Sequence, residues 1–339
     1  IGSLEAMGLY TYGDSYSYNG EIGGVQSGSP NRKLSWETTY MTNLGLRVEI
    51  FNRFDFELEA YRNYTKNLLS NLDVSRTTGD TRVYRNVGEI ENKGIEFTFT
   101  SRNFVPKKEG DFAWTTELNL SHNTNILKKL YNGIQKNFNT TSYIEGYDIH
   151  TYFLVRWAGV DPYDGMPMWY DANGNVTKTY STANRVPYKN SNPDVTGGVT
   201  NTFSYRGFSL RFLLNYQFGG YAFTSFGRST FSDGLNIQTE NQGIDQLKRW
   251  QQPGDVAENP RPIWGISTSS VMNSTRYLYN KTLIRLQNLV FSYQVPSKIA
   301  HSWGINDLTL SFVGDNLLTY SPYSGSDHNS YKTTMSGYP

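Results

Sequence analysis

Hydrophobic and polar residues alternate strictly along several long stretches of the chain. Every second residue is hydrophobic in 53–62, and the same alternation recurs in 95–100, 114–123, 208–218 and 308–315. A period of two predicts β-strands with one apolar and one polar face. Many of these stretches exceed the five or six residues of an ordinary strand and reach the roughly 9–11 residues that a tilted strand needs to cross a bilayer. Because the polar faces also carry amides, hydroxyls and full charges, the pattern favours a membrane barrel over a soluble sandwich.

The connections between these predicted strands alternate in length. Tight turns are expected at Asn52-Arg53 and Arg206-Gly207, and brief connections over 103–110 and 296–306. The intervening connections are long, at 13–35, 70–85, 126–194, 220–279 and from Ser321 onward. Bacterial barrels have short periplasmic turns and long extracellular loops, so we expect the long set outside the cell. This count gives about nine strands, an incomplete number for such a barrel.

Composition narrows the class of protein. The 339 residues carry a net charge of +1, which argues against a nucleic-acid partner. With 0 Cys, disulfides and thiolate metal sites are excluded. No run of about 18 apolar residues exists, so no transmembrane helix is expected. No signal peptide opens the chain at Ile1-Gly2-Ser3, and we interpret the sequence as a fragment.

Catalytic and metal-binding patterns are weak. Asp171–Asn175 is similar to the first half of a calcium loop, but Val176 and Thr182 stand where that loop needs Gly and Glu, so a turn centred on Asn173-Gly174 is predicted. Carboxylates at strand spacing, such as Glu57 and Glu59, are better explained as a charged wall than as a glycosidase pair. The 4 histidines lie far apart, at His122, His150, His301 and His328. We therefore expect no enzyme activity, no cofactor and no metal site.

Aromatic residues in the long connections are the candidates for ligand contact. They are Tyr143, Tyr147, Tyr163, Trp169, Tyr170, Trp250, Trp264 and Tyr323. Flat rings beside amides and carboxylates suit the faces and hydroxyls of sugars. The alternative is that the rings pack the loops against each other or against a partner that covers them. The sequence does not distinguish glycan from peptide cargo.

Groups of residues that follow one another along the chain carry a family resemblance. They are Leu34–Thr39 with Asn43–Leu46 and Phe51–Arg53; Asn86–Gly88 with Asn92–Glu96; Gly159–Pro162 with Trp169–Asp171; Arg249–Trp250 with Pro253–Asp255; Leu283–Leu289 with Ser292–Tyr293; and Asp315–Thr319 with Ser324–Asp327. In this order they resemble the C-terminal barrel half of the SusC/RagA family of TonB-dependent receptors. Gln287 stands where that family commonly has Lys, and the chain stops at Gly337–Pro339 where the family continues into a final strand.

The resemblance implies an all-β fold in which residues 1–339 form the C-terminal part of a large antiparallel transmembrane β-barrel, an open curved sheet with the final strand missing. The plug domain and TonB box have no counterpart in the sequence. It further implies an importer in the outer membrane of a Bacteroidetes-type Gram-negative cell. Expected partners are a SusD-like surface lipoprotein, TonB acting through the absent N-terminal part, an oligosaccharide or peptide substrate and outer-membrane lipid.

Two other functions remain open at this point. The first is a passive porin or a siderophore-type TonB receptor. An N-terminal plug with a TonB box would exclude the passive porin, and a lid lipoprotein encoded beside the receptor would exclude the siderophore type. The second is a soluble β-rich carbohydrate-binding module. If the hydrophobic side of 208–218 were buried against a second layer of the same polypeptide, the soluble module would replace the transporter.

Overall fold

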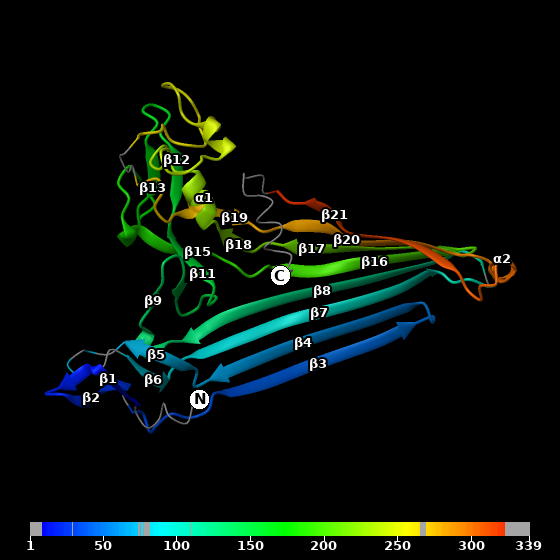
Figure 1. Cartoon of the computed structure of the whole chain (residues 1–339), viewed down its shortest axis with the longest axis horizontal. Helices are drawn as coiled ribbons and strands as arrows, with labels where there is room; N and C mark the ends of the chain where they lie inside the picture. Colours follow the sequence, from blue (N-terminus) through cyan, green and yellow to red (C-terminus); the bar gives the residue numbers. More distant parts are fainter. Residues whose placement is uncertain are drawn as a thin grey trace.

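The computed structural model describes residues 9–28, 30–73, 75, 77, 82–108, 110–264 and 269–322. One antiparallel sheet of 8 strands dominates it, in the order β21-β20-β17-β16-β8-β7-β4-β3 (Figure 1). Its strands are β3 (Thr38–Ile50), β4 (Phe54–Lys66), β7 (Glu89–Phe104), β8 (Ala113–Lys129), β16 (Val195–Tyr205), β17 (Phe208–Phe218), β20 (Leu283–Gln294) and β21 (Thr309–Tyr320). Lengths of 11 to 17 residues confirm the long strands that the alternation predicts.

The sheet is open. In the described part of the chain β3 and β21 each pair with a single neighbour, so the sheet has two free edges, as expected for part of a barrel. It has 8 strands and not about nine, because β1 (Leu9–Tyr18) and β2 (Glu21–Gly28) form a separate hairpin. The expectation of a missing final strand concerns residues after Pro322, which lie outside the described residues.

The strand register gives the middle of the sheet one apolar and one polar face. One row of directly paired residues crosses every strand and is entirely apolar: Val48, Phe56, Phe99, Leu118, Val199, Leu214, Leu286 and Leu318. The next row, on the opposite face, is polar or glycine: Arg47, Glu57, Thr98, Asn119, Gly198, Asn215, Arg285 and Thr319. We call these sides the apolar face and the polar face. Each strand alternates in register with its neighbours, so the two faces continue from one strand to the next.

Within the described residues, no second layer packs on the apolar face. The main contacts of each strand in the sheet are with its neighbours in the same sheet. Large apolar side chains on this face remain open, with Leu46 at 59%, Leu310 at 58% and Phe312 at 63% exposure. A soluble sandwich would bury these residues, so the structure contradicts that alternative. No helix in the described ranges has the length and apolar character that crossing a membrane requires.

Short connections gather at one end of the sheet, which we call the turn end. Phe51 and Asn52 adopt positive φ between β3 and β4, and Arg206 and Gly207 do so between β16 and β17. Such residues form the tight turns that match the twist of paired strands. The connection between β20 and β21 contains the helix α2 (Ser297–Ser302) and lies at the same end (Figure 1).

The long connections lie at the opposite end, which we call the loop end, and contain small elements of their own (Figure 1). Between β4 and β7 is the hairpin β5 (Leu69–Asp73) and β6 (Arg82–Asn86). Between β8 and β16 are β9 (Lys136–Asn137), β10 (Ser142–Tyr143), β11 (Thr151–Val155), β12 (Trp157–Val160), β13 (Pro167–Tyr170), β14 (Val176–Thr177) and β15 (Arg185–Asn190). Between β17 and β20 are β18 (Tyr221–Phe223), α1 (Ser225–Thr230) and β19 (Leu278–Asn280). These two long segments form a loop layer that contains most of the fully buried side chains.

Candidate functional site: the loop layer and its polar slot

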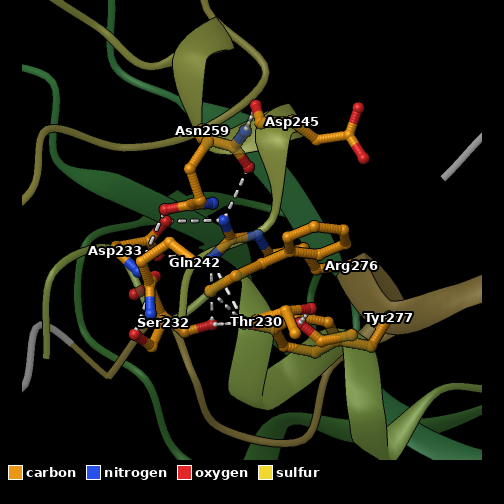
Figure 2. A network of polar contacts seen from close by, with 12 residues as sticks. Thr230, Ser232, Asp233, Gln242, Asp245, Asn259, Arg276 and Tyr277 are labelled. Atoms are coloured by element: carbon orange, nitrogen blue, oxygen red, sulfur yellow. Dashed lines mark hydrogen bonds and ion pairs between the residues drawn. The ribbon is translucent and has the colours of Figure 1, made fainter. Parts of the chain in front are cut away.

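A buried ion pair organises the loop layer. Arg276 lies in a short 3-10 turn before β19, and Asp233 follows α1 in the chain. The guanidinium donates from Nη1 to Oδ2 at 2.5 Å and from Nη2 to Oδ1 at 2.8 Å, so the pair is bidentate (Figure 2). The two side chains are only 6% and 1% exposed. A bidentate geometry supplies the hydrogen bonds that a charge needs once it is removed from water.

Neighbouring groups complete the surroundings of Arg276. Its Nη2 also donates to Asn259 Oδ1 at 2.8 Å, and its guanidinium lies 5.1 Å from the Trp157 ring and 5.3 Å from the Tyr277 ring. Burial acts to lower the pKa of Arg276, but the hydrogen bonds and charge of Asp233 hold that pKa above its ordinary value. Burial raises the pKa of Tyr277 to about 12. The network therefore joins the β8–β16 connection, through Trp157, to the β17–β20 connection.

Further contacts hold the β8–β16 connection together and join it to the β17–β20 connection. Lys178 Nζ lies 2.5 Å from Asp161 Oδ2 and 2.8 Å from Asp164 Oδ2, and these hydrogen bonds lower the pKa of both carboxyl groups. Trp250 Nε1 donates to Pro162 O at 2.9 Å. The loop layer is thus a packed unit and not a set of independent loops.

A polar slot opens where the loop layer meets the sheet. It has a volume of about 440 Å³ and separates residues 122–126 of β8 from residues 188–194, which lead into β16. Tyr147, Asp148 and Tyr221 complete its walls. Asn192 Nδ2 donates to Asp148 Oδ2 at 2.7 Å across one end of the slot. Amides, carboxylates, a lysine and tyrosine rings therefore surround a space that a small polar ligand can enter.

Two further cavities lie nearby. One, of about 420 Å³, separates the β5–β6 hairpin from residues 130–143 and is lined by Phe138 and Tyr143, whose rings meet edge to face at 4.9 Å. The other is a groove of about 610 Å³ on the polar face, lined by residues of β3, β4, β7 and β8 that include Glu59, Tyr61 and Glu96.

The predicted ligand-contact residues divide by position. Tyr147 lines the polar slot with 46% exposure, and Tyr143 lines the cavity beside the β5–β6 hairpin. Tyr163 and Trp264 are open on the surface of the loop layer, at 80% and 66% exposure. Tyr323 lies outside the described residues. The structure thus does not bring the candidate rings together at one site.

The other predicted rings pack within the loop layer. Trp169 is 0% exposed, with its ring 5.8 Å from that of Trp157 and 5.6 Å from that of Tyr180, so it has no surface to offer a ligand. Trp250 donates to a backbone carbonyl, and Arg156 lies 5.0 Å from the ring of Tyr170. The alternative explanation, that rings pack loop against loop, describes these residues. The sequence alone could not show which of these rings would be buried.

The slot contains residues that the sequence did not single out. Asn123, Tyr188 and Asp194 line it, although they come from segments with no chemical motif. Asn123 and Asn125, two residues apart in β8, indicated a polar side of this strand. Only the tertiary structure places that side of the strand beside residues 188–194. A turn forms in this segment, with Gly174 N donating to Asp171 O at 3.1 Å, so it is centred on Ala172-Asn173, one residue before the predicted Asn173-Gly174. Within the described ranges no group of three or more potential His, Cys, Asp or Glu metal ligands is present.

Comparison with known proteins identifies the type of barrel. No family profile matches the chain. TonB-dependent receptor P3 of Formosa agariphila is 28% identical over 329 residues, which cover 88% of this chain and 31% of that protein. TonB-dependent receptor SusC of Bacteroides thetaiotaomicron is 25% identical over 84% of this chain and 28% of its own length. The chain therefore spans about a third of the length of the curated relatives it matches.

Solved structures agree with these relatives. The RagAB peptide transporter superposes with a TM-score of 0.82 at 25% identity, covering 95% of this chain and 36% of that one. The open-open state of the RagAB peptide importer gives a TM-score of 0.84 at 24% identity, which supports the fold.

The chain is part of a large antiparallel β-barrel of the outer membrane, and its sheet has one apolar and one polar face. Among such barrels it matches a portion of a SusC/RagA-type TonB-dependent receptor.

Proposed function

We propose that this chain is the wall and mouth of a TonB-dependent importer that takes up oligosaccharides or peptides together with a SusD-like surface lipoprotein, and that it has no catalytic role. The loop end faces the outside of the cell and the turn end faces the periplasm. The observation that carries the proposal is the continuous separation of an apolar and a polar face across 8 paired strands, in a chain that matches SusC and RagAB. A polar face supported by a lipid-facing wall is the structure of a transport lumen.

Uptake measurements test the import step. Cells expressing the receptor that contains this chain are given fluorescent maltooligosaccharides or heptapeptides, with the inner-membrane proton gradient intact or collapsed. We expect saturable uptake of one cargo class that stops when the gradient is collapsed. Uptake that continues without the gradient would indicate a passive porin, and accumulation of an iron chelate alone would indicate a siderophore-type receptor.

Large apolar residues that are exposed on the loop layer support the lid partner. They are Tyr163, Ile244, Leu247, Val256 and Trp264, which are 80%, 73%, 65%, 95% and 66% exposed. Scattered apolar residues on a surface are ordinary, whereas a contiguous group is typical of an interaction site, and we infer that these five residues act as one such site. We call it the loop-layer surface, and we assign it to the lipoprotein.

Point substitutions test this surface better than removal of 220–279, because that segment contains the buried Asp233 and Arg276. The variant Val256→Asp with Trp264→Ser should reduce co-purification of the lipoprotein while leaving the receptor folded. The matched control is Glu258→Gln, which changes an exposed polar residue of the same segment. If the double variant retains the lipoprotein as well as the control does, the loop-layer surface is not the lid site.

A further inference from the structure

Among the described residues, the strand edge inside the polar slot has no partner strand. Strand β8 pairs with β7 along residues up to Lys129, but its pairing with β16 stops at Ser121. On that second edge the next backbone contacts are at Leu127, which donates to Tyr147 O at 2.8 Å and accepts from Gly146 N at 2.8 Å. Residues 122–126 therefore form a gap in the ladder, and this gap is one wall of the slot.

Backbone alternation shows which groups point into the gap. In an antiparallel strand, the N–H and C=O of one residue point to the same edge, and those of the next residue point to the other. Leu127 points toward the slot side, so Asn125 and Asn123 do as well. His122 O points the other way, since a Cβ on Gly94 of β7 would lie 2.5 Å from it. No hydrogen bond within the described residues occupies the backbone N–H or C=O of Asn123 or Asn125.

Such an edge is suited to one kind of ligand. Two backbone donor and acceptor pairs, spaced two residues apart, match the groups along one side of an extended peptide. A sugar has no repeating N–H and C=O groups at this spacing. Lys189 and Asp148 also line the slot, so groups of both charges lie near the edge.

We propose that the polar slot binds a short peptide in extended conformation, which adds as a strand to the β8 edge at Asn123 and Asn125. The proposal rests on the proposed import function and narrows its cargo at this site to peptides. Recognition through the backbone makes the slot tolerant of peptide sequence, because the side chains of the peptide do not form the ladder. Tyr147 and Tyr188 border the slot and cover the peptide.

The first experiment uses the unmodified protein. The complete receptor that contains this chain is purified in detergent and incubated with a pool of random heptapeptides, with the same pool N-methylated at every amide, or with maltoheptaose. Retention is measured by mass spectrometry. We expect the native pool to be retained, the methylated pool to be retained about tenfold less because it lacks backbone donors, and maltoheptaose to be lost.

Two substitutions at one position separate backbone from side-chain recognition. Asn123→Pro removes the N–H that points into the slot and spares the bonds to β7, since edge positions of this kind accept proline. Asn123→Ala removes the same side chain, including its bond from Tyr61 Oη, but keeps the backbone. We expect retention of the native pool to fall about tenfold in N123P and to stay within about twofold in N123A. Heat-modifiable migration on a gel verifies folding, and the methylated pool decides the question if N123P does not fold.

Equal retention of native and methylated pools, equal loss in N123A and N123P, full retention by N123P, or displacement of the peptides by maltoheptaose would each overturn the proposal. These outcomes concern binding by the purified receptor. If gradient-dependent uptake persists while the peptides are not retained, the slot assignment fails and the import function stands.

Discussion

Arg276 and Asp233 are the residues on which the loop layer most depends. Both are almost completely withdrawn from water, and each satisfies the charge of the other. Removing one partner leaves an unpaired charge in a buried site. This lowers the free energy of unfolding several times more than breaking an ion pair in solvent does. The Lys248–Glu258 pair is the natural comparison, with side chains that are 54% and 68% exposed.

We expect Asp233→Ala to destabilise the loop layer by about 3–5 kcal/mol, because Arg276 would remain buried without its counterion. Glu258→Ala should cost no more than about 1 kcal/mol. Limited proteolysis of the folded receptor, with the cleavage sites read by mass spectrometry, measures the opening of this layer. Equal protease resistance of the two variants would show that the buried pair does not hold the layer together.

Tyr277 makes the same layer sensitive to alkaline pH. Burial raises the pKa of its hydroxyl from 10.0 to about 12, and the hydroxyl donates to Ser270 O at 3.0 Å. A raised pKa means that the folded state keeps a proton that the unfolded chain releases. The stability it contributes is complete below pH 10 and declines as the pH rises toward 12.

Between pH 10 and pH 12, ionisation of the Tyr277 hydroxyl should reduce the stability of the loop layer by about 2–3 kcal/mol in the parent protein. Tyr277→Phe should show no such loss, because it has no proton to release. The measurement is protease resistance of the layer between pH 9 and pH 12, corrected with Tyr163→Phe, whose ring is 80% exposed. If the parent and Tyr277→Phe respond identically to pH, the buried hydroxyl is not the responsible group.

Among the elements of the sheet, glycine and tyrosine are paired across neighbouring strands. Tyr61 of β4 is opposite Gly94 of β7, and Tyr216 of β17 is opposite Gly197 of β16. Each tyrosine crosses its glycine and reaches the strand beyond, where the Tyr216 hydroxyl donates to Asn119 O at 2.8 Å. The glycines leave room for the ring, and the ring covers backbone that the glycine exposes.

Gly197→Ala should therefore destabilise the sheet by about 1–3 kcal/mol, since its Cβ would lie 2.1 Å from Asn119 O and 2.5 Å from the Tyr216 hydroxyl. Gly45→Ala in β3 is the matched control, because the nearest atom to its Cβ is Glu59 Cγ at 3.9 Å. The stability of both variants is measured by the urea concentration at which the receptor loses its heat-modifiable form. A Gly197 variant as resistant as the Gly45 variant would show that the ring does not need this space.

At the scale of the whole molecule, the two faces of the sheet determine which side of the barrel wall is suited to lipid. Leu214 and Asn215 are adjacent in β17, and their neighbours across the strands differ in kind: Val199 and Leu286 are opposite Leu214, whereas Gly198 and Arg285 are opposite Asn215. The apolar face must meet hydrocarbon, which accepts no charge without cost, whereas the polar face tolerates charge.

Leu214→Arg on the apolar face should lower the stability of the inserted barrel by about 2–4 kcal/mol, while Asn215→Arg on the polar face should leave it within about 1 kcal/mol. The two positions are neighbours in β17, so strand propensity and depth are matched. Refolding of each receptor variant into lipid vesicles, followed by denaturant titration, compares them. A greater loss for Asn215→Arg would reverse the assignment of the faces.

Much of the architecture followed from local pattern. The alternation predicted the strands, and the residues at Asn52 and Arg206-Gly207 predicted the tight turns, because both depend only on neighbouring residues. The candidate site was less predictable. Tyr147 lines the polar slot, whereas Trp169 has its ring close to those of Trp157 and Tyr180, contacts that link segments of different strands and turns.

The sequence by itself determined the strands, their two faces and the end of the sheet at which the long connections lie, since side-chain period and turn chemistry are local properties. Only the tertiary structure decided that the ladder between β8 and β16 stops at Ser121, that Asp233 meets Arg276 and that the loops pack into one layer. Those features join residues far apart in the chain, and their positions depend on how every strand between them is registered.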